Sequence, residues 1–114
     1  MKTEFVPYKL RAHEKNSSVC VVNLKNLTAE PVMSSIVIDV PKQLSVGSMG
    51  VSKQKEIKLG TIAPNESKES RVEIFGDVGT EAGDYTLTIS AFVHYVDYQH
   101  IVNSITKRVV LEAV

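Results

Sequence analysis

Residues 83–96 read Gly-Asp-Tyr-Thr-Leu-Thr-Ile-Ser-Ala-Phe-Val-His-Tyr-Val, and apolar side chains alternate with polar ones along most of this stretch. A period of two is typical of a β-strand, because successive side chains point to opposite faces. One predicted face carries Tyr85, Leu87, Ile89, Ala91, Val93 and Tyr95. The other carries Thr86, Thr88, Ser90 and His94. The pattern therefore predicts a central strand with the first face in the core and the second directed outward.

Further strands are predicted at residues 5–12, 18–24, 32–40, 53–62, 69–75 and 101–114. The first strand is expected at a sheet edge, and to split or change sheets at Pro7, because proline has no N–H to donate. The lysines of the 53–62 strand favour a second edge, and the last two strands are expected to form a hairpin. About seven strands with no helix predict one all-β domain over residues 1–114, an immunoglobulin-like antiparallel β-sandwich.

Residues 42–52, Lys-Gln-Leu-Ser-Val-Gly-Ser-Met-Gly-Val-Ser, contain two glycines and three serines. This composition predicts a long, mobile connection between strands. Its apolar residues, which include Leu44, Val46 and Met49, either contact a partner or fasten the loop to the sandwich.

The charges of the chain balance, with thirteen Lys and Arg against thirteen Asp and Glu. No long-range potential is available to attract phosphates, so nucleic acid is not an expected partner. No stretch is long and apolar enough for a signal peptide or a transmembrane segment. We therefore expect a cytoplasmic protein if the chain is complete, and an extracellular or cell-surface one if it is a fragment of a larger protein.

Cys20 is the single cysteine, which excludes an internal disulfide and a zinc site of several cysteines. It lies in the 18–24 strand, which is apolar on both faces. We interpret it as a small buried hydrophobic residue rather than a reactive thiol.

The 18–24 strand is followed by three motifs whose order and spacing extend over most of the chain: Asn-Leu-Thr-Ala-Glu-Pro-Val at 26–32, Leu-Gly-Thr-Ile-Ala-Pro-Asn-Glu-Ser at 59–67 and Gly-Asp-Tyr-Thr-Leu at 83–87. On these motifs the chain resembles prokaryotic immunoglobulin-like and fibronectin-like accessory domains of the cell adhesion related (CARDB) and NPCBM-associated types. The resemblance implies a seven-stranded sandwich that serves as a spacer, a docking module or an adhesion unit, usually without catalysis.

Tyr85 is placed to pin the crossover into its strand. In sandwiches, a tyrosine near the start of the penultimate strand buries its ring and returns its hydroxyl to the backbone a few residues upstream. The expected hydrogen-bond partner lies within residues 79–83, which makes Tyr85 a structural residue.

No catalytic site is predicted, because no nucleophile elbow, phosphate-binding glycine loop, zinc-binding His-Glu-x-x-His or dinucleotide fingerprint occurs in the sequence. A small metal-binding redox protein that uses His94, His100 and Cys20 is an alternative. Their spacing argues against it, because His100 and also His13 lie in predicted turns while His94 lies within a strand. We therefore predict neither a metal nor a cofactor.

The outward face of the 83–96 strand is the most suggestive surface, because Phe92 and Val96 interrupt its polar row beside His94. Large apolar groups on an exposed sheet face often mark a contact. The leading hypothesis is a non-catalytic module that binds a protein, or a second copy of itself. The candidate contacts are Phe92, His94, Val96 and Tyr98 on the last hairpin, and Val46 and Met49 in the loop. Addition of a strand to a free sheet edge is a further route, and a structural spacer excised from a larger surface protein is the remaining alternative.

Overall fold

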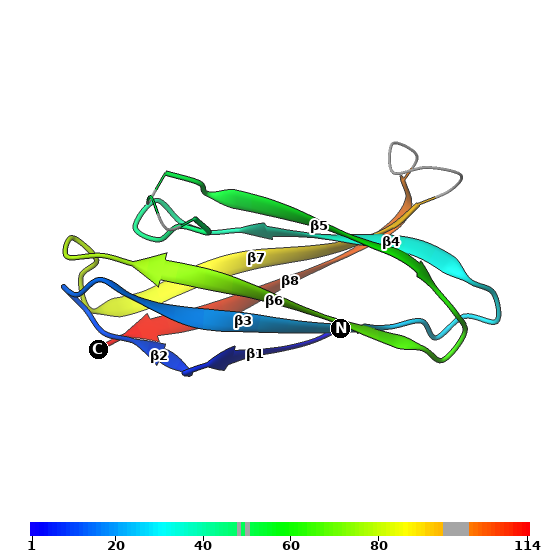
Figure 1. Ribbon diagram of the computed structural model, residues 1–114, viewed down its shortest axis with the longest axis horizontal. Helices are drawn as coiled ribbons and strands as arrows, with labels where there is room; N and C mark the ends of the chain where they lie inside the picture. Colours follow the sequence, from blue (N-terminus) through cyan, green and yellow to red (C-terminus); the bar gives the residue numbers. More distant parts are fainter. Residues whose placement is uncertain (48, 50, 95–100) are drawn as a thin grey trace.

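The computed structural model describes residues 1–47, 49, 51–94 and 101–114, which form a β-sandwich of two sheets (Figure 1). The three-stranded sheet has the order β1-β3-β6, with β1 at Lys2–Val6, β3 at Asn16–Lys25 and β6 at Ser67–Gly76. The five-stranded sheet has the order β2-β8-β7-β4-β5, with β2 at Lys9–Leu10, β8 at Ile101–Ala113, β7 at Gly83–His94, β4 at Val32–Asp39 and β5 at Gln54–Ile62. The predicted all-β, immunoglobulin-like fold is confirmed.

The predicted first strand is two strands, which raises the count among the described residues to eight. β1 pairs antiparallel with β3, whereas β2 pairs parallel with β8 in the other sheet. The change of sheet occurs at the cis Val6–Pro7 bond, as the missing N–H of Pro7 predicts. Figure 1 shows β2 beside the C-terminal end of β8, while β1 continues beside β3.

The core lies between the sheets, where alternate residues of the strands face one another. Leu87 and Ile89 of β7 are fully buried, as the alternating pattern of this strand predicts. Cys20 is also fully buried and packs within the core cluster. Burial raises the pKa of its thiol to about 11, because the apolar surroundings disfavour the charged thiolate. Cys20 is therefore a buried hydrophobic residue, as expected.

β7 is central in the five-stranded sheet, between β8 and β4, and forms the predicted antiparallel hairpin with β8. At its start, the Tyr85 hydroxyl donates a hydrogen bond to the carbonyl oxygen of Glu81 at 2.5 Å. The predicted role of Tyr85 is confirmed, because its ring also packs against the core. Among the described residues there is no helix of the length and apolarity needed to cross a membrane.

The connection between β4 and β5 is fastened to the sandwich over the part that the structure describes. Ser45 exchanges two backbone hydrogen bonds with Phe75 of β6, at 3.0 and 2.8 Å. Leu44 and Val46 are buried in the core cluster. Of the two interpretations of these apolar residues, the structure supports the fastening one.

Candidate functional site

One edge of the five-stranded sheet is open along most of β8. β2 covers this edge at two positions, Lys9 opposite Glu112 and Leu10 opposite Ala113. The preceding strand, β1, belongs to the other sheet. The edge of β8 is therefore covered near its C-terminal end and has no neighbouring strand before Glu112 within the described ranges.

The direction of the backbone groups on β8 follows from its last residues. The Val114 N–H donates to the Leu10 carbonyl oxygen at 2.9 Å, and the Val114 carbonyl oxygen accepts from the Ala12 N–H at 2.8 Å. Val114 therefore faces the β2 side. In a strand, every second residue directs its backbone groups to the same side. The pairing of β8 with β7 is regular from Asn103 to Ala113, so the groups of Val110, Arg108, Thr106 and Ser104 also point to the open edge.

Few of these groups are satisfied by the protein itself. The Ser104 N–H is bonded to the side-chain oxygen of Asn103 at 2.9 Å. For Thr106, Arg108 and Val110, no backbone partner on this side is found in the described part of the chain. The open edge thus presents a row of donors and acceptors that an added strand could pair with.

Apolar side chains gather on the same strand. Ile101, Val102, Ile105 and Val110 are each more than half exposed. The other two long edges, β5 and β6, carry charges of both signs, for example Lys55 and Glu56 on β5 and Lys68 and Glu69 on β6, and no large apolar residue that is more than half exposed. Charges on an edge oppose pairing with another chain. β8 is therefore the long edge with the most apolar surface.

Two cations lie in the middle of the open edge. Arg108 faces outward and Lys107 lies on the inner face, because they pair with Thr88 and the buried Ile89 of β7. Neither cation forms an ion pair with a residue of the described ranges. No acidic residue occurs from position 101 to position 111. We name residues 104–110, which include these two cations, the β8 edge.

An apolar groove opens between the sheets beside the start of β8. Its volume is about 410 Å³, and both sheets and the β3–β4 connection line it. Val102 and Ile105 contribute from β8, Val93 from β7, Leu24 from β3, and Met1 from the residue before β1. The groove therefore adjoins the β8 edge and shares residues with that strand.

A β-bulge and a buried hydroxyl mark this groove. Asn103 pairs with Val93 and Ile101 with His94, so Val102 is an extra residue in β8. Bulges re-aim side chains and end regular pairing. Ser34 lines the same groove, and its hydroxyl is buried with no hydrogen-bond partner among the described residues. The groove thus combines mostly apolar walls with a buried hydroxyl that has no partner among the described residues. Its other polar lining residues are Lys25, Asn26, Thr28, Asn103 and Ser104.

The residues predicted on the outer face of the last hairpin have different environments. Phe92 is partly buried, and its ring lies 6.3 Å from that of His94, centroid to centroid. His94 is 8% exposed, and its Nε2 lies 2.6 Å from the Ser35 hydroxyl. The imidazole is therefore held within the sheet rather than solvated. Val96 and Tyr98 lie outside the described residues.

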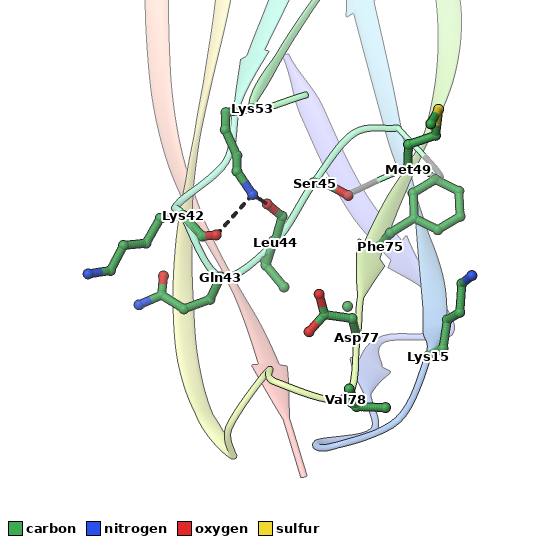
Figure 2. A pocket seen from close by; sticks show the side chains of 11 residues that line it. Lys15, Lys42, Gln43, Leu44, Ser45, Met49, Lys53, Phe75, Asp77 and Val78 are labelled. Carbon is green, nitrogen blue, oxygen red and sulfur yellow. Dashed lines mark hydrogen bonds between the residues drawn. The ribbon is translucent and has the colours of Figure 1, made fainter. Parts of the chain in front are cut away.

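The predicted contact residues of the loop also differ from each other. Val46 is buried, so its side chain is not presented on the surface, whereas Met49 is 86% exposed. Figure 2 shows Met49 beside the ring of Phe75, at the rim of a cavity of about 270 Å³. The Lys53 ammonium lies across this cavity and donates to the carbonyl oxygens of Lys42, at 2.9 Å, and Leu44. These contacts hold the loop in place.

The residues of the metal-site alternative are not brought together. Cys20 faces the core from the three-stranded sheet, whereas His94 lies on the outer face of the five-stranded sheet. His100 is outside the described residues. Within the part of the chain that the structure describes, no three His, Cys, Asp or Glu side chains gather as metal ligands would.

Comparisons with known proteins find similarity in fold. No protein-family model matches the chain, and no curated protein matches it. The structure is similar to SSP-19, an MSP-domain protein like family member in Caenorhabditis elegans, with 16% identity, a TM-score of 0.44, and coverage of 96% of this chain and 99% of that one. It is also similar to an ASH/PapD-like domain of human CEP192, with 12% identity, a TM-score of 0.49, and coverage of 93% and 77%. The resemblance to CARDB and NPCBM-associated domains stays a prediction.

Proposed function

We propose that this protein is a non-catalytic binding module that captures an extended segment of another protein along the β8 edge. The observation that carries the proposal is the row of backbone groups of Ser104, Thr106, Arg108 and Val110, which point to the open edge of the sheet. This edge is open because β1 pairs with β3 in the other sheet. A captured segment would continue the sheet in line with β2. Its backbone would supply the hydrogen bonds, and its side chains would give specificity.

The distribution of apolar surface supports the same edge. Four more-than-half-exposed apolar residues lie on β8, and Tyr8 and Val6, at the place where the chain changes sheets, are exposed as well. An added strand would cover part of this surface. Phe92, the predicted outer-face contact, lies on β7 beside β8. The hypothesis of binding through the last hairpin is therefore kept, but with the contact at the open edge of β8 instead of the outer face.

The test uses a displayed library of random twelve-residue peptides, selected on the immobilised protein. Enriched peptides are then titrated against the parent, Thr106→Pro and Thr106→Val. Proline removes the Thr106 N–H, which faces the open edge, without removing a bond to β7. Valine keeps the N–H and removes the hydroxyl that lies 3.3 Å from that of Ser90. Thr106→Pro is expected to weaken binding at least tenfold, and Thr106→Val to leave it within about twofold.

A matched control places proline on a different edge. Phe75 directs its backbone groups away from β3 toward Ser45, so Glu73, two residues earlier, faces the free side of β6. Glu73→Pro should leave peptide binding unchanged. The proposal is overturned if no peptide is enriched, or if the enriched peptides bind Thr106→Pro as tightly as the parent.

A further inference from the structure

We propose that the captured segment is acidic and carries an aromatic anchor: a carboxylate lies beside Arg108 on the outer face of the sheet, and an aromatic side chain with a polar tip fills the groove. This inference rests on the proposed function and adds the chemistry of the partner to it. The carboxylate, the anchor and the spacing between them each follow from a different observation.

Arg108 provides the charge. Its guanidinium is exposed, and no described residue forms an ion pair with it. The acid nearest along its own face, Glu112, already pairs with Lys9 at 3.5 Å. Residues directly opposite on neighbouring strands interact, and opposite charges there are favourable. An incoming strand with a carboxylate beside Arg108 therefore meets a complementary charge that the protein leaves unpaired.

Lys107 is less free to select an acid. It lies on the inner face and lines a shallow hollow with Lys2, Glu4 and Glu69. This hollow already contains the carboxylates of Glu4 and Glu69 beside its two ammonium groups, and the Glu69 carboxylate also pairs with Arg71 at 3.2 Å. Lys107 and Arg108 are adjacent cations in different surroundings, which makes Lys107 a matched control for Arg108.

The cations argue against a second copy of this chain as the occupant. In a two-fold antiparallel pairing of residues 104–110, Lys107 is the central residue and would face its own copy directly. Like charges directly opposite are destabilising, so the arrangement disfavours self-pairing and favours an acidic strand.

The groove provides the anchor site. Its walls are mostly apolar, and its volume of about 410 Å³ falls within the range of roughly 300–1,000 Å³ usual for ligand pockets. Buried hydroxyls normally have hydrogen-bond partners, and that of Ser34 has none among the described residues. A tyrosine or tryptophan supplies both an apolar ring and a polar tip that Ser34 can bond. An aliphatic anchor would leave the hydroxyl unsatisfied.

The spacing between anchor and carboxylate follows from the pleat. The groove is reached on the inner face beside Ile105 or Asn103, and Arg108 lies three or five residues further along β8 on the outer face. Side chains on opposite faces of a strand are an odd number of residues apart. The segment therefore has its aromatic residue and its acid separated by three or five positions.

The test uses the peptides enriched from the random library, resynthesised with the acid changed to Gln and the aromatic residue changed to Phe or Ala. Affinities are measured by calorimetry for the parent, Arg108→Gln, Lys107→Gln and Ser34→Ala. Arg108→Gln should weaken binding about two- to fivefold, as for an exposed ion pair, and the peptide's acid-to-Gln change should then have no further effect. Lys107→Gln should change affinity by less.

The anchor has its own readouts. Truncation of the aromatic residue to Ala should weaken binding at least tenfold. Ser34→Ala should remove the preference for Tyr over Phe without reducing the affinity of the Phe peptide. Peptides that lose binding with Thr106→Pro but carry neither an acid nor an aromatic residue at these spacings would overturn this inference and leave the proposed function standing. Peptides indifferent to Thr106→Pro would overturn the proposed function itself.

Discussion

The Tyr85 hydroxyl donates a hydrogen bond to the carbonyl oxygen of Glu81, four residues upstream. This bond ties the turn before β7 to the first residues of the central strand. Tyr85→Phe should lower the free energy of unfolding by about 0.5–1.5 kcal/mol, the net value of one hydrogen bond. Urea denaturation measures the change. Tyr8→Phe is the control, because Tyr8 is exposed and should show no loss; equal losses for both variants would contradict this role of Tyr85.

Ser34 and Ser18 are both buried, but their hydroxyls differ in partners. Ser18 donates to the Pro7 carbonyl oxygen, whereas Ser34 has no partner in the described ranges. Ser18→Ala should destabilise the protein by about 1 kcal/mol, because a hydrogen bond is lost. Ser34→Ala should cause no loss of stability, since it removes a buried group that is not satisfied. Thermal or urea unfolding of the two variants checks the difference, and a clear loss with Ser34→Ala would show that its hydroxyl is bonded.

The Cys20 thiol should be unreactive while the protein is folded. Its pKa is raised to about 11 by burial, so the thiolate, the nucleophilic form, is scarce at pH 8. A chromogenic disulfide reagent should label Cys20 promptly in guanidinium chloride and hardly at all without it. Because the folded pKa is higher than the unfolded one, the folded state holds its proton longer. Stability should therefore be intact below about pH 9 and fall as the pH rises toward 11. Fast labelling of native protein would refute the buried position.

The two halves of β8 should respond differently to truncation. Leu111 is fully buried in the core, whereas Ile105 is more than half exposed. Leu111→Ala should cost about 2–5 kcal/mol, because it removes buried surface and leaves a cavity. Ile105→Ala should change stability by less than about 0.5 kcal/mol, as for other surface sites. Equal costs in chemical denaturation would show that Ile105 belongs to the core.

Local patterning was sufficient to predict the elements of the fold. The alternation at Leu87 and Ile89 predicted β7 and its buried face, and Pro7 predicted the change of sheet at the N-terminus. The position of Tyr85 near the start of its strand predicted a hydrogen bond to residues 79–83, which Glu81 fulfils. These features depend on residues close together in the chain, which is why a sequence reveals them.

The β8 edge could not be predicted without the topology of the sheets. The apolar character of Ile101, Val102 and Ile105 was visible in the sequence. The sequence does not show, however, that no other strand pairs with this edge of β8. That depends on β1 pairing with β3 rather than with β8, a contact between segments far apart in the chain. The burial of His94 was missed for the same reason, because its neighbour Ser35 comes from another strand. For Val46 the sequence left burial and partner contact open, since the pairing of Ser45 with Phe75 joins segments far apart in the chain.

Amide hydrogen exchange at single-residue resolution, with and without a saturating enriched peptide, tests strand capture at the β8 edge most directly. The Thr106, Arg108 and Val110 amides face the open edge and should exchange quickly in the free protein. We predict that they become at least tenfold slower with peptide bound, while the Glu73 amide on the β6 edge does not change. Protection at β6 or β5 with none at Thr106, Arg108 and Val110 would contradict the account.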